Sequence, residues 1–180
     1  MNLTKLKPTR KWVSYSKAAG IIRNMILEGS HDPAVLDKAA AVVRQLPPNP
    51  AAQAQALWSF VRGAVTYLED PYNDDHFQGP AVTLQRRAGD CDDQVVLLGA
   101  LLRSVGFQVR LVFVFSERPK NYDADFPLHV YLEVNIEKGN FEPLWICADT
   151  VPSPDDQGGF YEARFGVDFP AGFREYVEVN

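Results

Sequence analysis

Three residues, far apart along the chain, have the side chains that thiol-based acyl transfer requires. Cys91 stands in the run GDCDD, while His129 and Asp149 lie in two later segments of alternating hydrophobicity. A nucleophilic thiol needs a stabilised thiolate, an imidazole that exchanges its proton and a third group that orients the imidazole. The residue types therefore suggest Cys91 as nucleophile, His129 as acid and base, and Asp149 as the orienting carboxylate.

The segment around Cys91 has the pattern of a helix that begins at the thiol. Asp90 is a favourable N-cap residue, Asp93 follows three residues later, and apolar residues fill most of positions 95–105 before Gly106. Apolar residues on nearly all sides predict a central helix that is covered by its neighbours. Its first-turn N–H groups would lower the thiol pKa and bind an oxyanion, whereas the nearby acids would raise that pKa.

His129 and Asp149 are expected on the two strands of one β-hairpin. Residues 129–134 and 144–149 alternate in hydrophobicity, and the run EKGN between them contains Gly139, which suits a tight turn. A turn centred on Gly139 places His129 directly opposite Asp149, with β-carbons about 5 Å apart. A slip of one residue would move the carboxylate to the other face of the sheet.

Helical spacing and capping residues predict earlier helices over about residues 15–27, 33–46 and 50–63, followed by a loop over residues 69–80. Residues 108–115 have apolar side chains on both sides, which predicts an interior strand. The last segment is rich in proline and glycine and predicts a packed loop with a short strand near residues 176–179.

The composition limits the classes of function. With 180 residues, of which 46% are hydrophobic and 23% charged, the chain is expected to form a single globular domain over residues 1–180. A net charge of −5 argues against nucleic acid and anionic membranes as partners, although residues 1–12 form a basic arm without acids. No apolar stretch has the length of a signal peptide or membrane span, so a cytoplasmic location is expected.

A metal site is the alternative interpretation of the acids around Cys91. Zinc sites use paired Cys or His at short spacing, and calcium loops alternate acids with an obligatory glycine, and GDCDD has neither arrangement. We therefore expect no metal and no cofactor. The residues that such a site would use are Asp90, Cys91, Asp92 and Asp93, with His76 or His31.

Three separate stretches resemble the transglutaminase-like superfamily. They are GDCDD with the run LLGALLRSVGFQVRLV behind it, then HVYLEV, and then Trp145 with Asp149 and Thr150, so the resemblance covers about residues 60–151. It implies a papain-like α+β fold in which the helix that carries the cysteine packs on an antiparallel sheet. It also implies the catalytic roles of Cys91, His129 and Asp149.

This chain departs from the family pattern at two points. Family members often have Trp two residues after the histidine, where this chain has Tyr131. An upstream side chain usually helps to bind the oxyanion, and Tyr67 and Gln85 are the candidates here.

The resemblance implies a cysteine-dependent amide or peptide hydrolase, or an acyltransferase, that acts through a thioester on a protein or peptide substrate. Hydrolysis is favoured over cross-linking because no residue pattern marks a site for an amine. The alternative is a non-catalytic binding or assembly module that keeps the fold. The chain resembles the small bacterial and phage members more than the large calcium-dependent animal enzymes.

Overall fold

The computed structural model describes residues 13–70, 76–137, 142–151, 153–154, 160–161, 164–165 and 173–180, with the backbone alone for 153–154, 160–161 and 164. The helices are α1 (Tyr15–Gly29), α2 (Pro33–Val43), α3 (Pro50–Ala64), α4 (Pro80–Arg86) and α5 (Cys91–Ser104). The longer strands are β3 (Gln108–Phe115), β4 (His129–Asn135), β5 (Trp145–Asp149) and β9 (Phe173–Val179). The short strands are β1 (Thr66–Tyr67), β2 (Ala88–Gly89), β6 (Ser153–Pro154), β7 (Phe160–Tyr161) and β8 (Arg164–Phe165).

The helices that precede the core begin where the sequence predicted them. Asp32 caps α2 by accepting a hydrogen bond from the Ala34 N–H at 2.8 Å, and Asn49 caps α3 through the Ala52 N–H at 3.1 Å. Both helices have proline in the first turn, where the missing N–H costs nothing. The short helix α4 was not predicted, because it directly follows a run of turn-forming residues.

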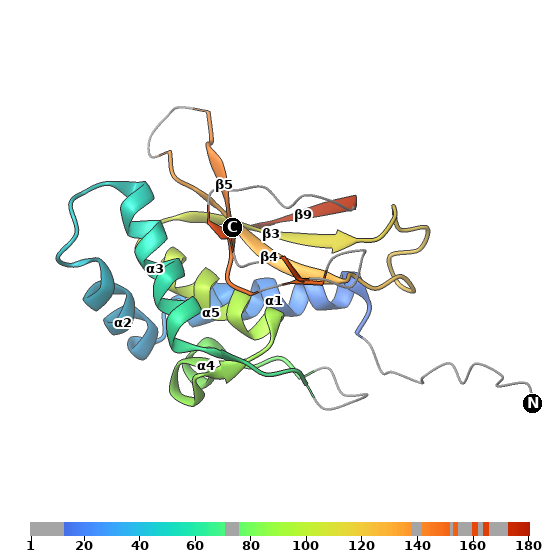
Figure 1. Ribbon diagram of the computed structural model, residues 1–180, viewed down its shortest axis with the longest axis horizontal. Coiled ribbons are helices and arrows are strands. Elements are labelled where there is room, and N and C mark those ends of the chain that lie inside the picture. The colour runs from blue at the N-terminus through green and yellow to red at the C-terminus, as the bar shows by residue number, and fades with distance from the viewer. Residues whose placement is uncertain are drawn as a thin grey trace, which may run out of the picture.

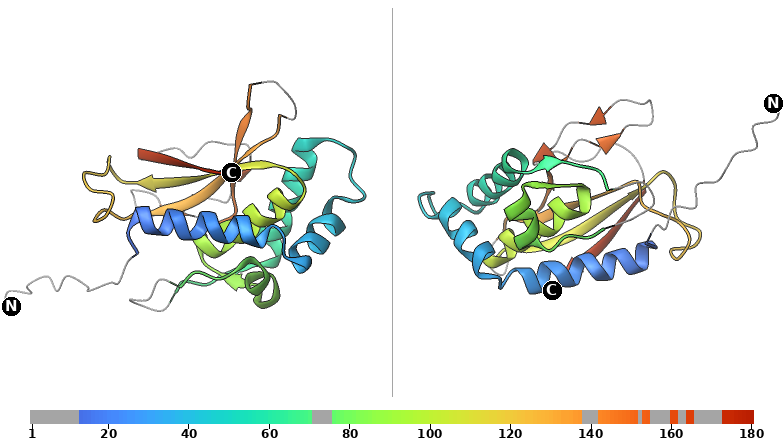
Figure 2. Two further views of the ribbon diagram at one scale, coloured as in Figure 1. Left: turned by 180° about the vertical axis from the view of Figure 1, so that it is seen from behind. Right: turned by 90° about the horizontal axis from the view of Figure 1, so that it is seen from below.

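One five-stranded antiparallel sheet organises the molecule, in the order β8-β5-β4-β3-β9. The helices lie together on one side of this sheet, with α1 and α5 beneath its central strands (Figures 1 and 2). The C-terminal strand β9 is longer than predicted and pairs with β3, so β3 is interior as its two apolar faces indicated. The α+β expectation is confirmed.

Helix α5 is the centre of the packing. It contacts α1, α2, α3 and α4 as well as β3 and β4, and residues 93–102 are all buried. Within it, Gly99 allows α1 to approach so closely that a β-carbon there would lie 2.7 Å from Ile26. Leu97 and Leu101 are fully buried, and truncation of such a residue to alanine costs roughly 2–5 kcal/mol. Gly106, with φ of +88°, ends the helical segment as predicted.

The hairpin of β4 and β5 has a different register from the predicted one. Glu133 pairs with Cys147 and Leu132 with Ala148, which is a shift of two residues from the expected pairing of Tyr131 with Cys147. The direct opposition of His129 and Asp149 was therefore wrong. Gly139, the expected centre of the turn, lies outside the described residues. A two-residue shift leaves every side chain on its predicted face, because side chains alternate with a period of two.

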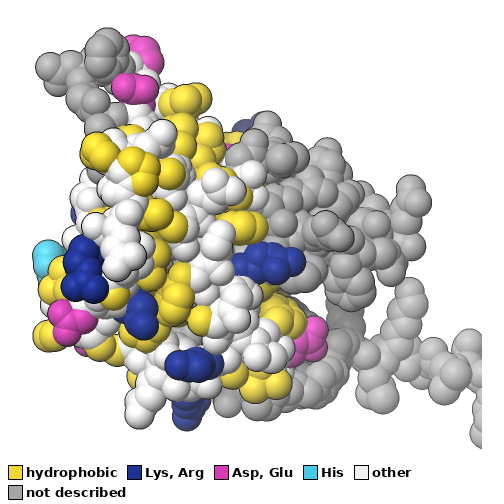
Figure 3. All heavy atoms as spheres, turned by 60° about the vertical axis from the view of Figure 1, so that its left-hand side comes forward, with side chains coloured by type: hydrophobic (Ala, Val, Ile, Leu, Met, Phe, Trp, Pro, Cys, Tyr) yellow, Lys and Arg dark blue, Asp and Glu magenta, His cyan; other side chains and the backbone are white. Residues whose placement is uncertain are grey.

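On the side of α2 and α3, the Lys and Arg side chains of the described residues are scattered among hydrophobic and uncharged atoms (Figure 3). These described side chains form no single basic patch in that view. Within the part of the chain that the structure describes, no helix combines the length and the apolar character needed to cross a bilayer.

Candidate active site

His129 and Asp149 are in direct contact at the start of β4 and the end of β5. His129 Nε2 lies 3.0 Å from Asp149 Oδ2, and the two side chains are only 5% and 2% exposed. The Val151 N–H donates to the other carboxylate oxygen at 3.2 Å. The Trp58 Nε1–H, from α3, donates to the Asp149 carbonyl at 2.7 Å. Asp149 is therefore held at two points besides the imidazole: its backbone carbonyl by Trp58, and one carboxylate oxygen by the Val151 N–H. The role of Trp58 was not predicted, since nothing local marks a tryptophan that reaches across the fold.

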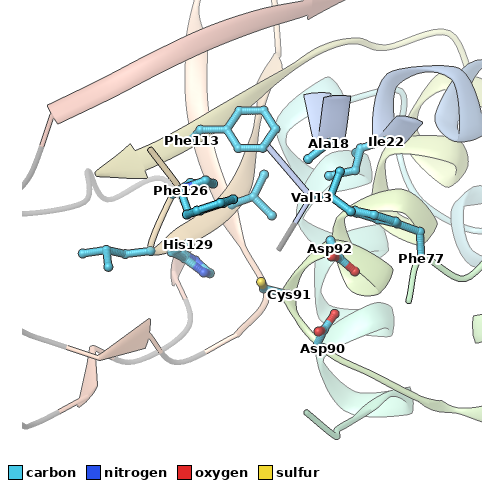
Figure 4. Close-up of a pocket in the computed structure, with 13 residues that line it drawn as sticks. Val13, Ala18, Ile22, Phe77, Asp90, Cys91, Asp92, Phe113, Phe126 and His129 are labelled. Carbon is cyan, nitrogen blue, oxygen red and sulfur yellow. The ribbon is translucent and has the colours of Figure 1, made fainter. Parts of the chain in front are cut away.

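Cys91 is the first residue of α5 and is partly exposed. It lines one cavity together with His129 and Val130. In Figure 4 the sulfur of Cys91 and the ring of His129 point toward each other, from α5 and from the start of β4. The fold therefore brings the three sequence-predicted residues together: Cys91 and His129 at the cavity, with Asp149 behind the imidazole.

The surroundings of Cys91 disfavour its thiolate. Burial raises the pKa of Cys91 well above its ordinary value, and the charges of Asp92 and Asp90 raise it further. A hydrogen bond from the Val130 backbone N–H to the sulfur acts in the opposite direction. A reactive Cys91 therefore needs a further stabilising positive charge.

Asp90 and Asp92 form a carboxyl pair beside the thiol. Burial raises the pKa of Asp90 to about 6 and that of Asp92 well above its ordinary value, and the two side chains share a hydrogen bond. Carboxylates this close do not both ionise readily, so the second of the two protons leaves the pair less easily than the first. Asp90 stands at the N-cap position, as predicted, but its side chain makes no capping hydrogen bond.

Asp93 has a separate, structural environment. Its carboxylate accepts hydrogen bonds from the Gln78 N–H at 2.7 Å and from the Gln78 side-chain amide. That amide also donates to the Ala88 carbonyl at 3.2 Å. Gly89 packs so closely that an added β-carbon would lie 2.6 Å from Asp93. Gln78 and Gly89 thus fix the start of α5 and the position of its first residue.

The three carboxylates Asp90, Asp92 and Asp93 have oxygens within 4.8 Å of one another, so they could hold a metal ion. Among the residues that the structure describes, neither histidine of the metal alternative joins this cluster, and His31 and His76 are exposed.

The remaining residues of interest lie either away from the Cys91 thiol or at the border of the site. Cys147, the second cysteine of the chain, is buried and packs with Val112 and Val114 on the sheet face opposite the helices. Of the oxyanion candidates, Tyr67 interacts electrostatically with the thiol. Burial raises the pKa of Tyr67, and the charge of Cys91 raises it further. Gln85 is exposed on α4.

Comparison with known proteins gives one family. The model described as "Transglutaminase-like superfamily" matches residues 37–150, more than half of the chain. It contains nearly all of the region in which the motifs were found and begins earlier, in α2. Comparison with curated proteins returned no match.

Several solved structures are similar to this chain. A proposed protease from Parabacteroides distasonis has a TM-score of 0.57 and 11% identity, over 91% of this chain and 35% of that protein. A proposed cysteine protease from Cytophaga hutchinsonii has a TM-score of 0.49 and 17% identity, over 86% of this chain and 56% of that protein. LapG from Legionella pneumophila has a TM-score of 0.46 and 20% identity, over 74% of this chain and 72% of that protein. The chain thus spans about a third of the first protein and about half of the second.

Proposed function

The chain belongs to the transglutaminase-like superfamily, and from this premise we propose that it is a cysteine-dependent amide or peptide hydrolase. Cys91 is the nucleophile, His129 the acid and base, and Asp149 the residue that orients the imidazole. The observation that supports the proposal best is the buried contact of 3.0 Å between His129 Nε2 and Asp149 Oδ2, at the wall of the cavity that contains Cys91. A carboxylate in that position keeps the ring in the tautomer that leaves Nδ1 for the thiol.

In the first half-reaction the Cys91 thiol transfers its proton to His129 and the sulfur attacks the substrate carbonyl carbon. The carbonyl π electrons move to oxygen, and the resulting oxyanion accepts hydrogen bonds from N–H groups of the first turn of α5, which have no partner within the helix. The C–N bond then breaks, and His129 returns its proton to the departing amine. The acyl group is left on Cys91 as a thioester.

In the second half-reaction His129 accepts a proton from water, whose oxygen attacks the thioester carbonyl. The C–S bond breaks, the protonated His129 returns the proton to the thiolate, and the carboxylic acid leaves. A positively charged His129 also supplies the charge that the thiolate requires next to two acids. Asp149 stabilises that imidazolium, and Trp58 holds the backbone of Asp149 in place through a hydrogen bond to its carbonyl.

The experiment is alkylation of Cys91 by iodoacetamide at pH 7, read by mass spectrometry of the Cys91 peptide. The proposal expects labelling faster than that of N-acetylcysteine, and roughly a 100-fold decrease in His129→Ala, in line with the loss of an activating base. His76→Ala is the matched control, because His76 is exposed and outside the site. Wild-type labelling no faster than N-acetylcysteine, together with no effect of His129→Ala, would contradict the proposal.

A non-catalytic binding or assembly module is the second candidate, and the strongly raised pKa of Cys91 favours it. In that case the thiol is a partly buried, protonated side chain, and the cavity or the basic arm of residues 1–12 binds a partner. Cys91→Ser would then leave the biological activity of the protein intact, while deletion of residues 1–12 would abolish it. The hydrolase proposal expects Cys91→Ser to abolish activity.

A further inference from the structure

The cavity that contains Cys91 is apolar on most sides other than the one formed by Cys91, His129 and the carboxyl pair. It has a volume of about 110 Å³ and lies between the start of α1, β3 and the loop before β4. Figure 4 shows this apolar group facing the sulfur and the imidazole across the cavity. Its apolar side chains include Val13, Ala18, Ile22, Phe77, Phe113 and Phe126.

The size of the cavity limits what it can accept. An apolar cavity of about 150 Å³ accommodates benzene, and this one is smaller. A branched aliphatic group of a few carbons suits it better than an aromatic ring. The carboxyl pair at one side repels an acidic group, so charge disfavours aspartate and glutamate, and the small volume disfavours aromatic side chains.

The mouth of the cavity also has apolar side chains in contact with solvent. Phe126 is 38% exposed and Leu128 is 59% exposed, although both line the cavity. A substrate that covers these apolar side chains stabilises its complex with the protein by about 25 cal/mol for each Å² of apolar surface removed from water.

We propose that this cavity is the specificity subsite of the enzyme, and that it binds a branched aliphatic side chain, such as that of valine or leucine, next to the scissile amide. The proposal rests on the proposed function, since it names the substrate class of that site. Phe126 and Ala18 are then specificity-determining residues, one at the mouth and the other on the wall contributed by α1.

The test uses N-alkyl iodoacetamides as probes of the space beside the sulfur. Rates of Cys91 alkylation by the N-methyl, N-isobutyl and N-benzyl reagents are measured at pH 9, where thiolate is more abundant, in a Cys147→Ala background. Each buried methylene is worth about a factor of four, so partial burial of the isobutyl group predicts roughly a tenfold preference over N-methyl. N-acetylcysteine with the same reagents corrects for their intrinsic reactivity.

Two variants locate the preference in the cavity. Ala18→Leu fills the space and should reduce the isobutyl preference to about onefold, whereas Lys17→Leu, at an exposed position of the same helix, should retain it. Phe126→Ala widens the mouth and should raise the N-benzyl rate relative to N-isobutyl. It serves as the test if Ala18→Leu does not fold. A preference that neither folded variant changes would overturn the assignment to this cavity.

The ratio of two reagents on one thiol does not depend on how His129 activates it, so the two proposals can fail separately. Equal rates for all three reagents, with labelling that still requires His129, would refute the subsite alone. A steep preference, with labelling that is slow and independent of His129, would refute the hydrolase proposal and leave the aliphatic pocket in place.

Discussion

The carboxyl pair predicts an unusual pattern of effects on the pKa of Cys91. The raised pKa values of Asp90 and Asp92 predict that the two carboxyls share one proton near neutral pH and together carry about one negative charge. If either is replaced by asparagine, the remaining carboxyl loses the repulsion of its neighbour, which lowers its pKa although burial still raises it. We expect it to ionise, so the charge near the sulfur stays about the same. Only the double variant Asp90→Asn with Asp92→Asn removes that charge. Asparagine is also a good N-cap residue, so the start of α5 is preserved.

The magnitude follows from the effect of one nearby charge. A charge in contact distance shifts a pKa by about 1–3 units, and water at the partly exposed site screens this, so the double variant should lower the pKa of Cys91 by about one unit. At pH 7 the thiolate fraction then rises about tenfold, while each thiolate becomes about threefold less nucleophilic. The net expectation is an alkylation rate about threefold higher in the double variant and nearly unchanged in each single variant.

The assay is the pH dependence of iodoacetamide alkylation between pH 6 and pH 12, in the Cys147→Ala background so that one thiol reacts. The midpoint of each profile gives the pKa of Cys91 directly, independent of nucleophilicity. Circular dichroism confirms that each variant is folded. An unchanged midpoint in the double variant, or a single variant that shifts the midpoint as far as the double one, would refute the shared-proton reasoning.

Three further predictions concern the support of the site. Trp58→Phe removes the hydrogen bond to the Asp149 carbonyl; urea unfolding should show a loss of about 1–2 kcal/mol, and peptide amide hydrolysis should lose kcat more than KM changes. Gly89→Ala forces a β-carbon against Asp93 and should cost about 1–3 kcal/mol in the same assay, whereas Gly63→Ala, in open space within α3, should be neutral or stabilising. The raised pKa values of the carboxyl pair mean that the folded state binds protons more tightly than the unfolded one; the pair's stabilising contribution, present below about pH 4, should be lost as pH rises through about 6, and the double variant should flatten this dependence.

The sequence predicted those elements whose signals are local. Caps at Asp32 and Asn49, the all-round apolar pattern of residues 95–105 and the two apolar faces of residues 108–115 depend on near neighbours only. The pairing of β9 with β3 could not be predicted in this way, because it joins strands far apart in the chain. The same holds for Trp58, whose indole reaches the end of β5, and for Gln78, whose amide fixes Asp93.

The predicted contact between His129 and Asp149 is present, although the two residues are not directly opposite each other as expected. In the observed register Asp149 follows the pair Leu132–Ala148, so it is offset from His129 by two positions. Diagonal neighbours on one face have α-carbons about 7–8 Å apart, still within reach of long side chains. The contact is accordingly made by Nε2, a ring nitrogen far from the backbone, with Asp149 Oδ2. The strand alternation alone therefore determined that both side chains share a face, and the length of the imidazole compensates for the offset.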